Sequence, residues 1–95
     1  GVVPMNTWIY VYNPYATNAM FANTWFHFNA AGIMETGYHW YQSADGNWRL
    51  FYLHEGADGY RGRMYMNETI PDGNYADANG FIYINGIRAV KVSFS

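Results

Sequence analysis

The 95-residue chain has no cysteine and little charge. The lack of cysteine excludes a disulfide framework and a thiolate metal site. Only 5 residues are Lys or Arg, against 7 Asp or Glu, so the formal net charge is −2. Because nucleic-acid binding depends on clustered cations that release counterions from phosphate, we expect no nucleic-acid partner.

Long apolar runs are also missing. No run reaches the roughly 18 residues that a membrane-spanning helix needs, so we expect no membrane insertion. No basic start precedes an apolar core, so the sequence predicts no signal peptide. Since the chain opens with Gly1 rather than Met, we expect it to be a fragment of a larger secreted protein.

Aromatic residues are what the chain has in abundance. Its 10 Tyr, 6 Phe and 4 Trp make up 21% of the residues, whereas charged residues make up 13%. Helix-rich surfaces favour Glu, Lys, Leu and Ala, whereas aromatic residues and glycine turns suit strands. The composition therefore predicts a single all-β domain over residues 1–95.

Short aromatic runs alternate with turn residues along the whole chain. Asp45-Gly46 is a two-residue hairpin signal, because both residues tolerate a positive φ. An alternation of Val90, Val92 and Phe94 with polar residues predicts a last half-buried strand. The predicted strands are Trp8–Tyr12, Trp25–Phe28, Ile33–Tyr38 with an extension to Gln42, Trp48–Leu53, Phe81–Ile84 and the segment from Ile87 onward.

The chain also contains a degenerate internal repeat. Trp25-Phe26-His27-Phe28 matches Leu50-Phe51-Tyr52-Leu53, and Tyr75 opens a third match. The offset is 25 residues from His27 to Tyr52 and 23 from Tyr52 to Tyr75, a period found in solenoids. One hairpin cannot hold itself together in water, but stacked hairpins can bury their aromatic faces. We predict a short solenoid of stacked β-hairpins, with repeats over roughly 6–24, 25–47, 48–70 and 71–95, the first irregular.

Five motifs, in this order along residues 6 to 84, resemble the cell-wall-binding repeats of Gram-positive surface proteins, also called choline-binding or glucan-binding repeats. The family combines Asp-Gly with aromatic strands, a turn that ends in Gly, a Met and Thr-Gly-Trp. The motifs are Trp8–Pro14, Asn29–Gly32 with Met34 and Thr36-Gly37-Tyr38, Asp45-Gly46-Asn47-Trp48, Tyr52-Leu53 with Ala57-Asp58-Gly59 and Gly62-Arg63-Met64, and Asn67-Glu68-Thr69 with Pro71–Tyr75. Tyr38 stands where the family has Trp, and a second Thr-Gly-Trp is lost after Met64.

This resemblance implies a ligand site between neighbouring hairpins. Trp25, Tyr38 and Tyr52 would wall it, Met34 would form an apolar floor, and Trp48 lies on the adjoining strand. Ring faces attract a quaternary ammonium by cation–π interaction and also stack on sugars. The implied partners are cell-wall polysaccharide, teichoic-acid choline or a glucan, and the choice among them stays open.

The remaining polar residues suggest no chemistry. The histidines lack metal-ligand spacing, the carboxylates are dispersed, and no nucleophile motif is present, so we predict no metal, no cofactor and no enzyme. Arg49, Arg61 and Arg63 are expected to be solvated, with a contact of Arg61 and Arg63 to acidic wall polymer as an alternative. The predicted function is non-catalytic attachment to the bacterial cell surface, and the alternative is a spacer or adhesion module without ligand sites.

Overall fold

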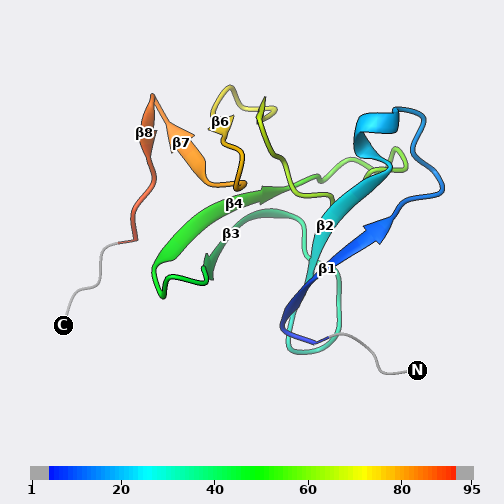
Figure 1. Cartoon of the computed structure of the whole chain (residues 1–95), viewed down its shortest axis with the longest axis horizontal. Helices are drawn as coiled ribbons and strands as arrows, with labels where there is room; N and C mark the ends of the chain where they lie inside the picture. The colour runs from blue at the N-terminus through cyan, green and yellow to red at the C-terminus, as the bar shows by residue number, and fades with distance from the viewer. Residues whose placement is uncertain (1–4, 92–95) are drawn as a thin grey trace. The chain divides into compact units, whose positions relative to one another are not determined.

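A computed structural model describes residues 5–91 as an all-β chain with small antiparallel sheets, none of them closed. This confirms the all-β prediction. The described residues contain one 3-10 helix and no α-helix, and none of their helices could cross a bilayer. The elements are β1 (Thr7–Tyr12), η1 (Ala19–Phe21), β2 (Asn23–Phe28), β3 (Gly37–Gln42), β4 (Trp48–Leu53), β5 (Glu68–Thr69), β6 (Tyr75–Ala76), β7 (Ile82–Ile84) and β8 (Ile87–Arg88) (Figure 1).

The described chain forms two compact units, each made of two stretches of sequence. Unit 1 contains residues 5–37 and 53–64, and unit 2 contains residues 38–52 and 65–91. The boundaries at Gly37 and Leu53 lie in β3 and β4. Each unit therefore depends on contacts between segments that are distant in the sequence.

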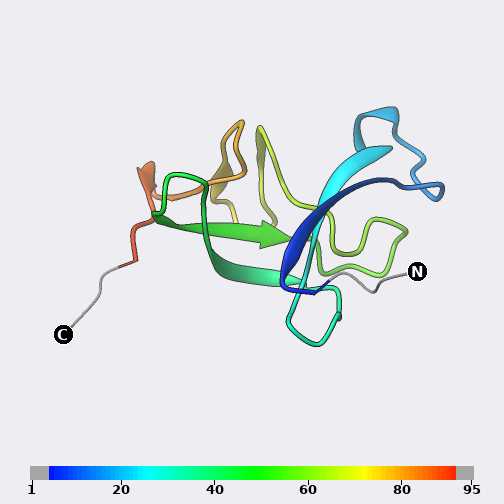
Figure 2. The ribbon, with the colours of Figure 1, turned by 60° about the horizontal axis from the view of Figure 1, so that its bottom comes forward.

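In unit 1, β1 and β2 pair antiparallel with Tyr10 opposite Trp25. The connection between these strands packs against the turn after β4 (Figure 2). The Asn13 side-chain amide donates to the Gly59 carbonyl at 2.6 Å, and the Thr17 backbone N–H donates to the Tyr60 hydroxyl at 2.7 Å. These bonds hold the segment that connects β1 to β2.

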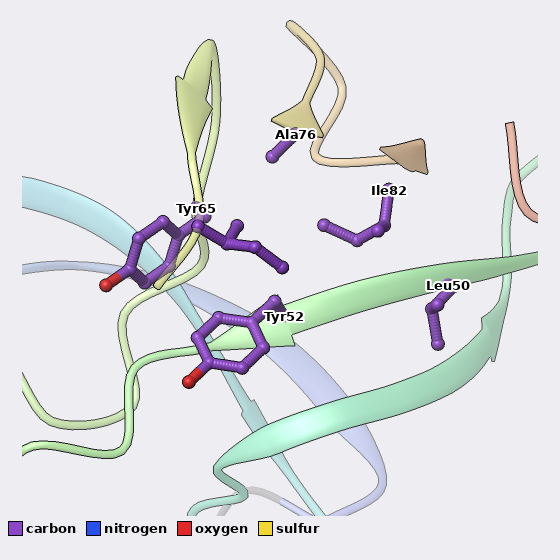
Figure 3. Close-up of a cluster of buried hydrophobic side chains, with 6 residues drawn as sticks. Leu50, Tyr52, Tyr65, Ala76 and Ile82 are labelled. Atoms are coloured by element: carbon purple, nitrogen blue, oxygen red, sulfur yellow. The ribbon is translucent and has the colours of Figure 1, made fainter. Parts of the chain in front are cut away.

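In unit 2, β3 pairs with β4, and β5 to β8 form a four-stranded sheet in chain order. A hydrophobic core joins residues from β4 with residues from that sheet and its leading segment (Figure 3). Ile82 is fully buried and Ile70 nearly so. The core consists of Leu50, Tyr52, Tyr65, Ile70, Ala76 and Ile82, with Trp40 and Ala89 packed against it.

One hydrogen-bonded turn recurs through both units, and we call it the glycine turn. The backbone N–H of its first residue donates to the carbonyl of the residue four positions after it. The backbone N–H of a glycine three positions after the first residue donates to the carbonyl of that first residue. This is the three-residue hairpin loop in which a type I turn ends in a glycine of positive φ. Among residues 5–91 it begins at Asn29, Ser43, Ile70 and Asp77.

A longer version begins at His54. Its N–H donates to the Arg63 carbonyl at 2.9 Å, and the Gly62 N–H donates to the His54 carbonyl at 2.8 Å. The bonds are those of the glycine turn with five residues inserted, because Gly62 lies eight positions after His54 instead of three. The inserted segment carries Gly59 and Tyr60, the residues that bind the N-terminal connection.

The predicted repeat offsets reappear in these turns. The starts at Asn29, His54 and Asp77 are 25 and 23 residues apart (54 − 29 and 77 − 54). In each hairpin, the residue directly before the turn pairs with the residue directly after it. The pairs are Phe28↔Met34, Leu53↔Met64 and Ala76↔Ile82. Three hairpins therefore share one register.

Two local predictions were wrong. In the Asp45-Gly46 loop only Gly46 has a positive φ, of +85°, because Asp45 accepts the Asn47 N–H and stabilises a three-residue loop instead of a two-residue one. Of the strand predicted over Ile33–Tyr38 with its extension to Gln42, the first part is reduced to one bridge at Met34, since the chain turns at Gly37 with φ +81°. The rest is confirmed as β3 (Gly37–Gln42).

The end of the chain also differs from the prediction. The last hairpin forms as expected around Asn85-Gly86, where both residues have positive φ. Its second strand, β8, ends at Arg88, and Val90 lies outside any strand. Val92 and Phe94, the other residues of the predicted terminal alternation, lie outside the described residues.

Two glycine-to-alanine substitutions test the glycine turn. Gly46→Ala should lower the free energy of unfolding by about 1–2 kcal/mol, because a Cβ strains a residue at positive φ while nothing lies within 4 Å of it. Gly62→Ala should cost about 1 kcal/mol more, since its Cβ would also come within 2.5 Å of the Met34 sulfur, which must move aside. Urea denaturation of both variants measures the difference, and equal losses would contradict the close approach of Met34.

Candidate aromatic binding site

The five residues predicted to form the site divide between the two units. Trp25 and Met34 belong to unit 1, and Tyr38, Trp48 and Tyr52 belong to unit 2. Within unit 2, Tyr38 and Tyr52 meet edge to face, with ring centroids 5.0 Å apart. Each unit therefore has its own set of aromatic residues to consider.

In unit 2 the Tyr38 ring belongs to a row of packed tyrosines. Tyr52 contacts Tyr38 of β3 and also Tyr65, which lies between the Met64 bridge and β5. The Tyr52 and Tyr65 ring centroids are 5.1 Å apart, and both residues are buried. The Tyr38 hydroxyl donates to the Asp72 carboxylate and accepts from the Asn74 side-chain amide at 3.2 Å. Tyr38 still exposes 39% of its surface, so its ring is held in place and reaches solvent.

Trp48, at the start of β4, is 43% exposed. The Lys91 ammonium lies 4.2 Å from the centroid of its ring. This is a cation–π contact, the interaction by which an aromatic face would also bind a quaternary ammonium. One cation is therefore already placed over the indole that the prediction assigns to a ligand.

In unit 1 the Trp25 ring lies on the exposed face of the β1–β2 pair. Its cross-strand neighbour is Tyr10, with ring centroids 5.0 Å apart and the ring planes inclined by 51°. Tyr12 lies two residues along β1 on the same face and is 67% exposed. Sequence reasoning missed Tyr10 and Tyr12, because only the strand register places them beside Trp25.

Met34, the predicted floor of the site, packs between two turns of unit 1. It bridges Phe28 across the first glycine turn, and its thioether fills the space above Gly62. A flexible, polarisable side chain suits such a gap. Its observed position is that of a packing residue between two turns.

The arginines correct a further prediction. Arg49 and Arg63 were expected to be solvated, yet they expose only 8% and 6% of their surface. The Arg63 guanidinium lies 3.9 Å from the Phe21 ring centroid, and that of Arg49 lies 5.3 Å from the Phe81 centroid. Because guanidinium is weakly hydrated and stacks on rings, aromatic residues can cover it. Of these three arginines, Arg61 alone is exposed and could meet an acidic polymer.

A buried polar pair occupies one position of the repeated hairpin. The Nδ1 atom of His27 lies 2.6 Å from the Glu35 carboxylate, and Trp8 packs against the imidazole. The same cross-strand position holds Tyr52 and Tyr65 in the second hairpin and Tyr75 and Tyr83 in the third. Residues 5–91 contain no group of three His, Cys, Asp or Glu that could hold a metal ion.

Hydrogen bonds shift the pKa of two tyrosines in opposite directions. Partial burial, together with the bond to Asp72, raises the pKa of Tyr38, because both disfavour a phenolate. The hydroxyl of Thr17 and the backbone N–H groups of Thr17 and Asn18 lower the pKa of Tyr60, because they donate to its oxygen. The two tyrosines therefore report separately on the two units.

No family model, curated protein or solved structure matches the chain. The resemblance to cell-wall-binding repeats therefore stays a prediction.

A tyrosine titration tests the described contacts. Carbon-13 NMR of the ring Cζ atoms should show Tyr60 ionising before Tyr38. The neutral Tyr38 stabilises the fold below the ordinary pKa of about 10, and that contribution is lost as the pH rises through its raised pKa. Tyr38→Phe and Tyr60→Phe assign the two signals. Ionisation of both at one common pH would contradict the described hydrogen bonds.

Proposed function

We propose that the chain is a non-catalytic attachment module that binds polysaccharide or choline-type groups at a bacterial cell surface. The observation that carries the proposal is the set of partly exposed aromatic rings, the paired Tyr10 and Trp25 in unit 1 and the separate Tyr38 and Trp48 in unit 2, on a chain of repeated hairpins. Tyr and Trp combine an apolar ring with a polar tip and are enriched where proteins bind partners.

The repeated register supports an array as the architecture of such a module. Hairpins that share turn, register and bridge position could stack as the units of a short solenoid, each burying its neighbour's aromatic side chains. An array of this kind offers successive ring faces to a polymer with repeating groups. Secretion to the cell surface belongs to the same proposal, since the partners it names are found there.

The chemistry of the exposed residues supports binding without catalysis. The groups on these faces are ring systems, hydroxyls and amides, which stack and form hydrogen bonds. The buried His27–Glu35 pair is 5% exposed at His27 and packs under Trp8. The imidazole is therefore covered, and the Glu35 carboxylate bound to it is only 16% exposed.

The alternative, a spacer without ligand sites, has one observation in its favour. The Tyr38 hydroxyl is bound by Asp72 and Asn74, and its ring packs on Tyr52. These contacts give Tyr38 a structural role that needs no ligand. Under this alternative the exposed rings would bind neither choline nor sugar.

Retention on immobilised ligands distinguishes the two. The whole chain should be retained on choline-derivatised resin or on insoluble glucan, and soluble choline or glucan should release it. A spacer would pass through both columns, and that result would contradict the proposed function.

Substitutions at Tyr38 locate any choline binding. Tyr38→Trp should strengthen retention on choline resin, because indole offers the better face to a cation. Tyr38→Ala should weaken the affinity for choline by about tenfold, which corresponds to a loss of about 1.4 kcal/mol of binding free energy. Tyr75→Ala, which removes another exposed strand tyrosine, is the control. If Tyr38→Ala and Tyr75→Ala are retained equally, Tyr38 does not bind choline.

A further inference from the structure

We infer that the outer face of the β1–β2 pair, formed by Tyr10, Tyr12 and Trp25, is a stacking platform for an uncharged glycan. We call these three residues the Tyr10 face. The inference rests on the proposed function, in that it names one site and one ligand class for the attachment module. The site differs from the one predicted from sequence, which contains Trp25 alone of these three residues.

The strand register assembles the Tyr10 face. Tyr10 lies directly opposite Trp25, and Tyr12 lies opposite Asn23. Residues opposite one another in an antiparallel pair point to the same side, and residues two apart on one strand do so as well. Tyr10, Tyr12, Trp25 and Asn23 therefore share one side of the two-stranded sheet.

Burial separates this side from the other. Along β2, Thr24 and Phe26 are buried, whereas Asn23 and Trp25 between them are exposed. Tyr10 exposes 57% of its surface, Tyr12 67% and Trp25 37%. The alternation over residues 23–26 places Trp25 on the side that faces solvent at this end of the sheet, and it ends at the buried His27.

A contiguous set of exposed rings on a sheet is unusual for a chain with a small core. Burial of aromatic surface stabilises a fold, so leaving three rings partly exposed forgoes part of that stabilisation. Exposed apolar patches with a polar border mark sites of interaction. Asn23 and the tyrosine hydroxyls supply that border, and they both donate and accept hydrogen bonds.

Charge selects the class of ligand. The side chains of the Tyr10 face and of Asn23 beside it carry no formal charge. The ionisable pair on the same side of β2, His27 and Glu35, is bonded to itself and largely covered. Pyranose rings have apolar faces that stack on aromatic rings and hydroxyl edges that bond to amides, so an uncharged glycan complements this surface.

Ring geometry argues against a choline cage on the same face. A cation held by two rings lies over both faces, each centroid within about 6 Å of it. Tyr10 and Trp25 are in direct contact at 5.0 Å with their planes inclined by 51°. Because the two rings touch, they cannot enclose a trimethylammonium group between them, whereas a sugar can stack on the exposed face of either ring.

Fluorine NMR of the chain labelled with 5-fluorotryptophan tests the inference, because each of the 4 tryptophans gives its own signal. The probes are cellohexaose, maltohexaose and choline chloride, titrated separately. At least one hexaose should shift the Trp25 signal saturably and leave the Trp48 signal in place. Choline should leave Trp25 unchanged.

Three variants keep the test independent of folding. Tyr10→Ala should weaken hexaose binding by about tenfold, the effect of about 1.4 kcal/mol. Tyr10→Phe keeps the stacking ring and should bind within about threefold of the parent chain, a difference below 1 kcal/mol. Tyr75→Ala is the matched control, an exposed tyrosine on β6 of unit 2, and should bind like the parent.

The possible failures are distinct. Hexaose shifts at Trp48 but not at Trp25 would overturn the Tyr10 face while leaving the attachment function standing. A choline shift at Trp25 without a hexaose shift would overturn the ligand class. No shift of any tryptophan with any probe would overturn this inference, and failure of the chain to bind either resin would then remove the proposed function as well.

Discussion

The fold depends on the glycine turn. In each of its occurrences within residues 5–91, a glycine at positive φ lets two short strands reverse and places the flanking residues in one register. Since β5, β6 and β8 are only two residues long, ladder bonds alone would not hold them, and isolated hairpins are marginal in water. The turns and the aromatic side chains between them supply the rest of the stability.

The shared register also explains why similar positions carry such different chemistry. Opposite residues in the three hairpins are a His–Glu pair, a buried tyrosine pair and a second tyrosine pair. The hairpin backbone accommodates each of these residue pairs, because the repeated geometry requires only the glycine turn and the bridged pair beside it. The longer turn at His54 keeps the repeated hydrogen bonds, and its inserted residues lie outside them. Two of these residues, Gly59 and Tyr60, bind the connection between β1 and β2. A repeat can thus lose its aromatic motif and keep its shape.

Sequence reasoning predicted the parts that are local. The strand Trp48–Leu53, the glycine-ended turn at Asn29 and the offsets of 25 and 23 follow from patterns within a few residues, and the structure confirms them. The Tyr10–Trp25 pair could not be predicted, because it depends on the register across a ten-residue connection that is held by a distant turn. The burial of Arg49 and Arg63 was missed for a similar reason, since the rings that cover them come from other segments.

The most direct test of this account is NMR measurement of couplings across the backbone hydrogen bonds. The account predicts couplings from Asn29 N–H to the Ile33 carbonyl, from His54 N–H to the Arg63 carbonyl and from Asp77 N–H to the Phe81 carbonyl. All three would be seen together in the folded chain. Acceptors at any other positions, or a coupling at one turn and none at the other two, would contradict a single hairpin register used three times.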